Sequence, residues 1–170
     1  SLSPELALSV VTSSAQKTYD YSATTGGFDA RVGAGVLDID RMFEAALNYI
    51  DGANDNDYEG DIITKKIYVT AGEELQVGFA WLITAEEVRN SHADLHITDY
   101  DVKIYDYLYA DQPIASSTST NSNVEVVRYT PQYDGQVWVV VTQNDPIDWS
   151  YIEYDYYALT YAGGMETPYG

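Results

Sequence analysis

The sequence contains no cysteine and few cationic residues. Without cysteine, disulfides and thiol chemistry are excluded. Only 8 Lys and Arg accompany 27 Asp and Glu, which gives a formal net charge of -19. So few cations argue against nucleic acid and against an anionic membrane surface as partners. No apolar run is long enough to span a bilayer. The excess of carboxylates does permit divalent cations, which prefer oxygen ligands.

Alternating hydrophobicity dominates the second part of the chain. With 170 residues and 45% hydrophobic content, the chain can bury one good core. Around residues 99–106, Val102 and Ile104 point to one face while Lys103 and Tyr105 point to the other, as in a half-buried strand. The same alternation predicts strands near 63–70, 74–82, 101–106, 114–118, 124–129, 136–143 and 152–161. We therefore expect a mainly β fold, a jelly-roll-like antiparallel β-sandwich preceded by a short two-helix segment.

Two helices are predicted before the sandwich. Ser3 and Pro4 are typical of a helix start, and this helix should end near Ala15. Residues 16–28 show no period and predict a loop. Asp38 should cap a second helix from Ile39 to about residue 48. Its predicted apolar side consists of Met42, Phe43, Ala46 and Leu47.

The changes in residue pattern along the chain predict the domain organisation. Residues 1–50 form the helical segment, and the acid-rich residues 51–62 are expected to be a linker. Residues 63–162 form the sandwich, with a polar loop at 84–99, and residues 163–170 a tail. The chain begins at Ser1, and we expect it to be a piece of a larger protein.

The first 48 residues resemble the end of a subtilisin-like serine protease domain. The residues that carry the resemblance are Ser3-Pro4-Glu5, Ser13-Ser14-Ala15, the stretch 30–38 and Ala45-Ala46-Leu47. The second half resembles the bacterial pre-peptidase C-terminal domain, a sandwich appended to secreted proteases. The matching positions there are Asn54-Asp55, Ala71-Gly72, Asp99 to Val102, Ile114 to Ser117, Asn123 to Glu125, Gly135 to Val137 and Tyr157 to Leu159.

These resemblances imply the non-catalytic C-terminal part of a secreted, extracellular bacterial endopeptidase. The parent would hydrolyse peptide bonds with a Ser-His-Asp triad, but the family's three triad motifs do not occur in this sequence. No catalytic residue is therefore assigned, and the chain is expected to be inactive. The sandwich would be an accessory, stabilising or substrate-binding domain. The alternative is an independent extracellular binding module for peptide, collagen-like protein or glycan, and a structural spacer is a third possibility.

An acid-rich stretch suggests calcium. Asp55, Asp57 and Glu59 lie at alternate positions, as at the opening of a calcium loop, but Lys66 at the twelfth position excludes an EF-hand. Resemblance to the collagen-binding domains of clostridial collagenases implies calcium between such a linker and an acidic strand. The candidate ligands are Asp55, Asp57, Glu59, Asp99 and Asp101. The alternative is a solvated, metal-free linker.

A second possible metal site is less favoured. His92, Asp94 and His96 would share one face of an extended backbone and could bind zinc. No third strong ligand is spaced nearby, so a solvated loop is the preferred interpretation.

Tyrosines and tryptophans suggest a binding surface. Tyr157 and Tyr161 should face the core, whereas aromatic residues of the opposite phase should be exposed. Rows of exposed rings can bind extended peptide or sugar. The candidates are Tyr105, Tyr107, Trp138, Tyr154 and Tyr156, with Tyr109 in the same phase. The alternative is that a neighbouring domain covers this surface.

The helical segment 1–50 also implies partners. Its apolar residues would pack on the rest of the parent protease. In this chain alone we expect the segment to dock on its own sandwich or to pair with a second copy as a homodimer.

Overall fold

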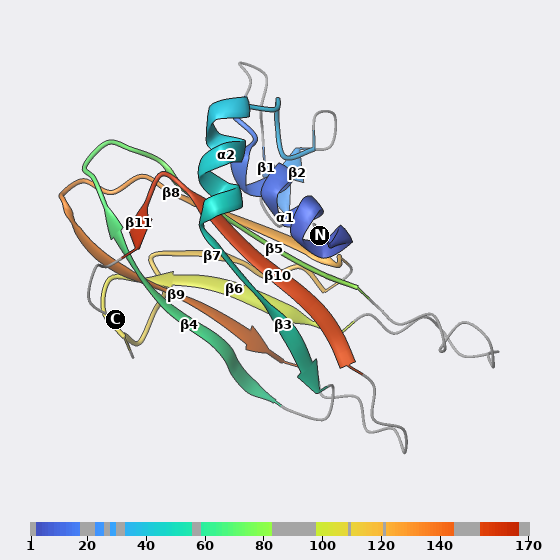
Figure 1. Cartoon of the computed structure of the whole chain (residues 1–170). Helices are drawn as coiled ribbons and strands as arrows, with labels where there is room; N and C mark the ends of the chain where they lie inside the picture. The colour runs from blue at the N-terminus through green and yellow to red at the C-terminus, as the bar shows by residue number, and fades with distance from the viewer. Residues whose placement is uncertain are drawn as a thin grey trace, which may run out of the picture.

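The computed structural model describes residues 3–17, 23–25, 28–29, 33–55, 59–82, 98–108, 110–120, 122–144 and 154–166 (Figure 1). Two antiparallel sheets face each other, and two short helices lie on the outer side of one of them. The predicted β-sandwich preceded by a two-helix segment is therefore confirmed. No helix among these residues has the length and apolarity needed to cross a membrane.

The two sheets contain all seven strands predicted from alternation. The four-stranded sheet has the order β3 (Tyr49–Asp55), β10 (Tyr154–Ala162), β5 (Leu75–Leu82) and β8 (Val124–Tyr129). The five-stranded sheet has the order β11 (Met165–Glu166), β4 (Gly60–Val69), β9 (Gly135–Gln143), β6 (Tyr100–Tyr105) and β7 (Ala115–Ser117). Neighbouring strands are antiparallel throughout both sheets.

The core lies between the sheets and is rich in aromatic rings. The ring centroids of Phe79 and Trp81 are 5.4 Å apart, and the Tyr100 ring meets Trp81 edge-on at 5.0 Å. The alternate valines of β9, together with Leu75 and Val77 of β5, fill the same layer, and all of them are buried. Tyr161 is buried in this core and Tyr157 packs against it, as their phase predicted.

Both predicted helices are present with their predicted caps. Helix α1 (Pro4–Ser14) has Ser3 as N-cap, whose side chain accepts a hydrogen bond from the Leu6 amide. Helix α2 (Ile39–Leu47) has Asp38 as N-cap, which accepts from the Arg41 amide. Both helices pack on the four-stranded sheet, α1 against β10 and β5, and α2 against α1 and β10.

The prediction of an acidic linker at 51–62 is wrong for the described part of that stretch. Residues 51–55 belong to β3, an edge strand that pairs along its whole length with β10. Gly60 and Asp61 already belong to β4. At the β3 edge, Gly52 lies opposite Tyr157, and a Cβ on Gly52 would be 2.7 Å from the Tyr157 hydroxyl. The tyrosine ring thus covers the glycine and compensates for its poor strand propensity.

Two smaller elements also differ from expectation. The predicted loop at 16–28 contains β1 (Ala23–Thr25), which pairs with β2 (Phe28–Asp29). The predicted tail contains β11, whose two residues pair with the end of β4. Such short pairings depend on a partner strand rather than on their own sequence pattern, so periodicity does not reveal them.

Candidate functional site

Helix α1 approaches the four-stranded sheet through its small polar side chains. Ser9, Thr12 and Ser13 are buried against Gly78 of β5 and Thr160 of β10. A Cβ on Gly78 would lie 2.7 Å from the Thr12 hydroxyl and 2.8 Å from the Ser9 carbonyl oxygen. The absence of a side chain at residue 78 therefore allows the helix to lie directly on the sheet backbone.

Hydrogen bonds connect the helix to the sheet. The Ser9 hydroxyl donates to the Gly78 carbonyl at 2.8 Å, and it lies 2.9 Å from the Thr160 hydroxyl. The Ser13 hydroxyl lies 2.7 Å from the same threonine. The Gln76 amide donates to the Thr12 carbonyl at 2.5 Å. These serine and threonine hydroxyls contact one another and backbone carbonyls, which is a structural arrangement and differs from that of a base-activated nucleophile.

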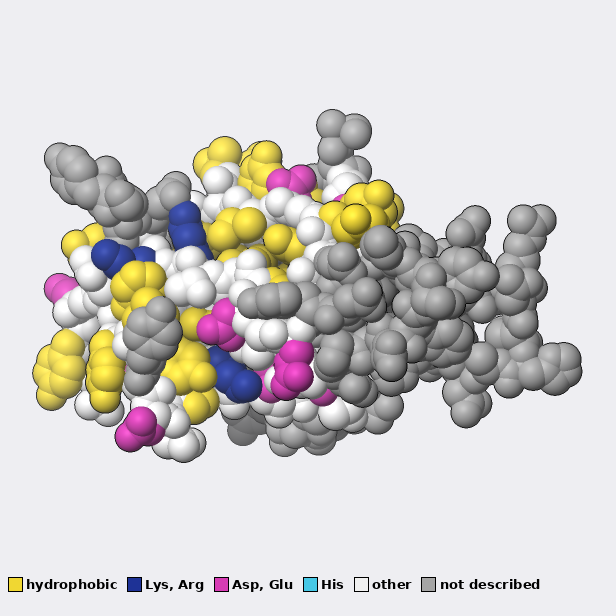
Figure 2. Space-filling view, turned by 90° about the horizontal axis from the view of Figure 1, so that it is seen from below, with side chains coloured by type: hydrophobic (Ala, Val, Ile, Leu, Met, Phe, Trp, Pro, Cys, Tyr) yellow, Lys and Arg dark blue, Asp and Glu magenta, His cyan; other side chains and the backbone are white. Residues whose placement is uncertain are grey.

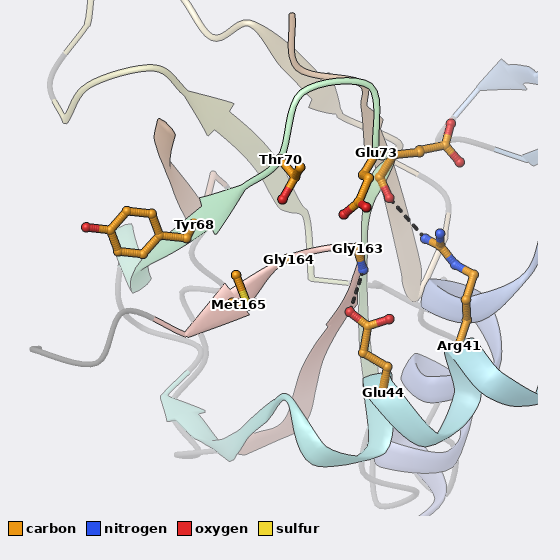
Figure 3. Close-up of a pocket in the computed structure, with 9 residues that line it drawn as sticks. Arg41, Glu44, Tyr68, Thr70, Glu73, Gly163, Gly164 and Met165 are labelled. Carbon is orange, nitrogen blue, oxygen red and sulfur yellow. Dashed lines mark hydrogen bonds between the residues drawn. The ribbon is translucent and has the colours of Figure 1, made fainter. Parts of the chain in front are cut away.

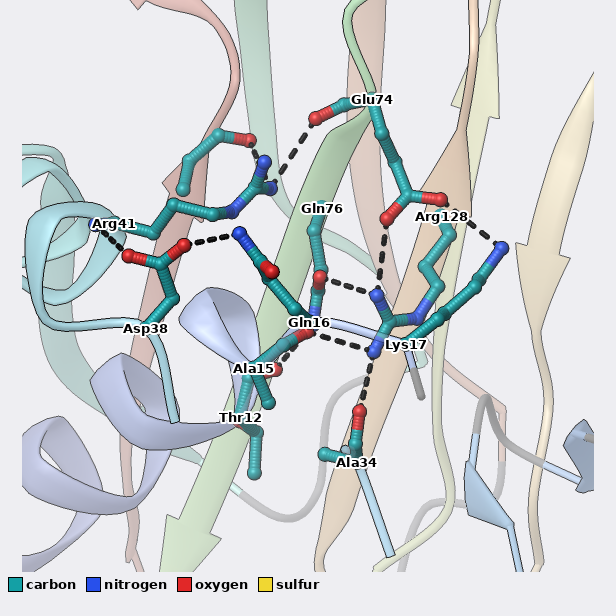
Figure 4. A network of polar contacts seen from close by, with 11 residues as sticks. Thr12, Ala15, Gln16, Lys17, Ala34, Asp38, Arg41, Glu74, Gln76 and Arg128 are labelled. Carbon is teal, nitrogen blue, oxygen red and sulfur yellow. Dashed lines mark hydrogen bonds and ion pairs between the residues drawn. The ribbon is translucent and has the colours of Figure 1, made fainter. Parts of the chain in front are cut away.

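Arg128 of β8 extends this interface to the segment that follows α1 (Figure 4). Its guanidinium donates to the Glu74 carboxylate at 3.0 Å and to the Gln76 side-chain oxygen at 2.5 Å. It also donates to the backbone carbonyls of Ala15, at 3.1 Å, and Ala34. A single nearly buried cation thus ties both ends of the stretch between the helices to the sandwich.

Glu74 is the anionic partner in this network. Lys17 lies 3.0 Å from its second carboxylate oxygen. Burial raises the pKa of Glu74, but the hydrogen bond from Lys17 and the charges of Arg128 and Lys17 outweigh that effect. The pKa of Glu74 therefore lies below its ordinary value, and the carboxylate is ionised at neutral pH.

Helix α2 has one covered face and one exposed apolar face. Met42 and Ala45 pack with Val10 of α1 and Ala162 of β10. The predicted apolar side is thus only partly correct, because Phe43, Ala46 and Leu47 are exposed. We call the exposed apolar residues the α2 stripe; their exposed fractions are 58% for Val36, 56% for Leu37, 69% for Ile39, 70% for Phe43 and 84% for Leu47.

The predicted aromatic binding face divides into two separate groups. Tyr105 and Trp138 are cross-strand partners on the outer face of the five-stranded sheet, and the Lys66 ammonium lies 5.1 Å from the Trp138 ring centroid. We call these three residues the Trp138 platform. Tyr107, 62% exposed, lies in the bend that follows β6.

The other candidates lie elsewhere. Tyr154 and Tyr156 are exposed on β10 of the four-stranded sheet, so they do not join the Trp138 platform. Tyr109 lies outside the described residues. On the side of the molecule opposite the helices, hydrophobic side chains lie among basic and acidic ones (Figure 2).

The candidate calcium ligands do not converge in the described part of the chain. The Asp101 carboxylate is 2.8 Å from the Lys103 ammonium on the same strand, and Glu59 is exposed before β4. Asp99 is half-buried just before β6. Asp57, His92, Asp94 and His96 lie outside the described residues, as does the side chain of Asp55. Among the residues that the structure describes, no group of three His, Cys, Asp or Glu is arranged to hold a metal, and calcium binding stays a prediction.

A buried carboxyl group was not found by sequence reasoning. Glu125 of β8 is fully buried, and it accepts hydrogen bonds from the Ser117 hydroxyl and, at 3.0 Å, from the Ser119 amide. Burial raises the pKa of Glu125 to about 7, and nearby Asp101 and Asp99 contribute in the same direction. The sequence does carry a signal for this burial. Glu125 lies two residues before the core residue Val127, so both side chains point to the same face of β8.

A second buried polar cluster joins four strands. The Tyr100 hydroxyl donates to the Asp155 carboxylate at 3.0 Å, and the Asn54 amide donates to the Tyr100 hydroxyl at 3.2 Å and to the Gln143 side-chain oxygen. Burial and the Asp155 charge raise the pKa of Tyr100, so its hydroxyl stays protonated. The cluster links β3, β6, β9 and β10 across the sandwich. A buried hydrogen-bond network of this kind helps to fix one arrangement of the two sheets.

Comparison with known proteins adds no relative: no protein-family model matches the chain, and no curated protein matches it.

Proposed function

We propose that this chain is the non-catalytic C-terminal part of a secreted subtilisin-like serine endopeptidase. In this proposal the sandwich is an accessory domain. The helical segment is its junction with the catalytic domain, which supplies the Ser-His-Asp triad. The sequence motifs in residues 3–48 that resemble the end of such a catalytic domain support this assignment.

The observation that carries the proposal is the α2 stripe. Helix α2 packs on α1 and the sandwich through Met42 and Ala45, yet the α2 stripe leaves five large apolar side chains more than half exposed. Ile39, Phe43 and Leu47 follow one another at a spacing of four residues along one face of α2, and exposed apolar surface of this kind is typical of an interaction site. Burying apolar area stabilises an interface by about 25 cal/mol per Å². A catalytic domain that packs on the α2 stripe would gain this energy.

The first test is reactivity. A fluorophosphonate probe should label no serine of the 170-residue chain, and casein should not be cleaved. The coding sequence immediately upstream should encode a Gly-Thr-Ser-type nucleophile motif, and the longer protein should be labelled at that serine. An upstream sequence without the motif, or labelling of any serine within this chain, would contradict the proposal.

The second test addresses the α2 stripe itself. Hydrogen exchange over residues 39–47 should be slower in the longer protein than in this chain, and the double variant F43S/L47S should abolish the difference. Tyr133→Ser is the matched control, because Tyr133 is 80% exposed in a turn far from α2 in sequence. Equal protection of residues 39–47 in both proteins would show that no catalytic domain covers the stripe.

A second candidate function is supported by the Trp138 platform. The outer face of the five-stranded sheet is not covered by α1 or α2, and it carries Trp138, Tyr105 and Lys66 side by side. An aromatic surface of this kind fits an extended peptide or a sugar ring. On this proposal the sandwich is an extracellular binding module.

A peptide and glycan array separates the two candidates. Binding that Trp138→Ala removes and that Tyr154→Ala leaves unchanged would favour the module. Tyr154 is a suitable control because it is exposed on the other sheet. An array without any bound ligand would leave the accessory-domain proposal as the only one of the two.

A further inference from the structure

A pocket of about 380 Å³ opens beside α2 (Figure 3). Three elements form it: α2, the connection from β4 to β5, and the turn from β10 to β11. The lining side chains include Arg41, Glu44, Tyr68, Thr70, Glu73 and Met165. The volume lies in the range of small-ligand pockets.

The charge of the pocket is negative. Glu44 and Glu73 lie on opposite sides of it, one on α2 and the other after β4. Neither forms an ion pair with another described residue, whereas Glu74 is already paired with Lys17 and Arg128. Arg41 directs one guanidinium nitrogen to the backbone carbonyls of Glu74, at 3.2 Å, and Ala162, at 3.5 Å. Two carboxylates therefore remain to attract a cation.

The other end of the pocket is apolar and is fixed by strand pairing. Tyr68 and Met165 are cross-strand partners on β4 and β11, with exposed fractions of 37% and 66%. Backbone forms the wall between the two ends, because Gly163 and Gly164 carry no side chains. A Cβ on Gly164 would lie 2.6 Å from a methyl carbon of Ile67, so this wall has to remain glycine.

We infer that this pocket binds the side chain of an arginine or lysine residue in a peptide. The charged head lies between Glu44 and Glu73, and the aliphatic stem packs on Met165. This inference is independent of the proposed parent protease, because it concerns only residues of this chain.

Isosteric peptides test the inference directly. Titration of the 170-residue chain with acetyl-Ala-Ala-Arg-Ala-Ala-amide, followed by amide NMR shifts, should perturb Thr70 and Gly163. The citrulline peptide, which has the same shape without the charge, should bind at least about threefold more weakly, as loss of a partly exposed ion pair allows. The norleucine peptide keeps the stem alone and should bind more weakly still than the arginine peptide.

Variants separate the pocket from general attraction to an acidic protein. Glu73→Gln should weaken the arginine peptide by about threefold, and the double variant E44Q/E73Q by about tenfold. Asp111→Asn makes the same charge change between β6 and β7, at the other side of the sheet, and should leave the affinity unchanged. Glu73 is exposed and Glu44→Gln keeps its acceptor for the Gly163 amide, so both variants should fold, which a thermal melt checks.

Three results would overturn the inference. They are equal binding of the arginine and citrulline peptides, equal weakening by Glu73→Gln and Asp111→Asn, or no binding of the arginine peptide. None of them bears on whether a catalytic domain covers the α2 stripe, so failure of this inference and failure of the proposed function are distinguishable.

Discussion

The two faces of the four-stranded sheet are packed by different chemistry. Its inner face contributes Phe79, Trp81 and Leu159 to an apolar core shared with the five-stranded sheet. Its outer face receives α1 through serine and threonine hydroxyls, a glutamine and an arginine. The inner contact is stabilised by burial of apolar surface, and it tolerates substitution of one hydrophobic residue by another of similar volume. In the outer contact each buried polar group needs its own partner, so the contact specifies one arrangement.

The largest effect is expected from breaking the inner contact. Phe79→Ala should lower the free energy of unfolding by about 3–5 kcal/mol, because it removes a fully buried ring that contacts three other aromatic rings. Urea unfolding should show one transition in which α1 is lost together with the sheets. Tyr133→Ala, at an exposed turn, should change stability by less than about 0.5 kcal/mol.

Loss of Arg128 should be the next largest effect and should act on the outer contact. Arg128→Met leaves the Ala15 and Ala34 carbonyls without this donor and Glu74 with Lys17 alone. We expect a loss of about 2–3 kcal/mol, as for hydrogen bonds to a charged group. Hydrogen exchange over residues 4–17 should accelerate more than exchange in β5. A uniform acceleration across the molecule would show that the outer contact is not a separate unit.

Crowding the helix should have an intermediate effect. Gly78→Ala places a methyl group within 3 Å of Thr12 and Ser9, so α1 must shift, at a cost of about 1–3 kcal/mol. Gly135→Ala is the matched control, since a Cβ at residue 135 meets nothing within 4 Å. If thermal melts of the two variants coincide, α1 does not lie on the sheet at this distance.

A smaller effect should come from the buried Glu125 carboxyl group and should depend on pH. Glu125 has a pKa of about 7 when folded and an ordinary value of 4.5. Between these values the folded state keeps a proton that the unfolded state releases, so the free energy of unfolding should fall as pH rises from about 4.5 to 7.

The variant Glu125→Gln should remove this dependence. It keeps an oxygen that accepts from the Ser119 amide and gains an NH2 group that donates to the Ser117 hydroxyl oxygen, and above pH 7 it should be more stable than the wild type by about 1–2 kcal/mol. Denaturant titrations at pH 5 and pH 8 provide the measurement. An unchanged pH profile in the variant would show that another group titrates in this window.

Calcium should have the smallest effect and should act only on the sandwich. At a concentration equal to its dissociation constant, a bound ion adds about 0.4 kcal/mol. The melting temperature should be slightly higher with calcium than with chelator, and exchange within α1 should be unaffected. Asp99→Asn should remove the difference. Identical melts with calcium and chelator would favour the solvated alternative.

The strands were predictable where core-facing apolar residues occupy every second position, as in β5, β6 and β9, because each alternate residue faces the same core. Strand β3 was not, because Asp51, Gly52 and Asn54 are poor strand formers that are held by pairing with β10. Of the residues predicted on the apolar side of α2, Met42 packs on the sandwich, together with Ala45, whereas Phe43 and Leu47 are exposed. Helical period alone does not fix which part of an apolar arc meets its neighbour.

The contacts of the candidate sites were less predictable than the strands. Phase correctly placed Trp138 and Tyr105 on one outer face, but it could not show that Tyr154 and Tyr156 belong to the other sheet. The pocket beside α2 depends on residues 41–44, 68–73 and 163–165, which only the fold brings together. Such a pocket cannot be predicted from the sequence, because its three segments lie far apart along the chain and none of them carries a recognisable motif.

The hydroxyls beneath α1 can be ordered in only one direction. Ser9 uses its proton on the Gly78 carbonyl, so Thr160 donates to Ser9. Ser13 then donates to Thr160 at 2.7 Å rather than to the Val10 carbonyl, which lies at the longer distance of 3.3 Å. The chain of donation therefore runs from Ser13 through Thr160 to Ser9 and ends on the sheet backbone. A helix moved along the sheet by one residue would present these protons to the wrong oxygens. Helix α1 consequently has a single axial position on the sandwich, which is set by the donors and acceptors of these three hydrogen bonds.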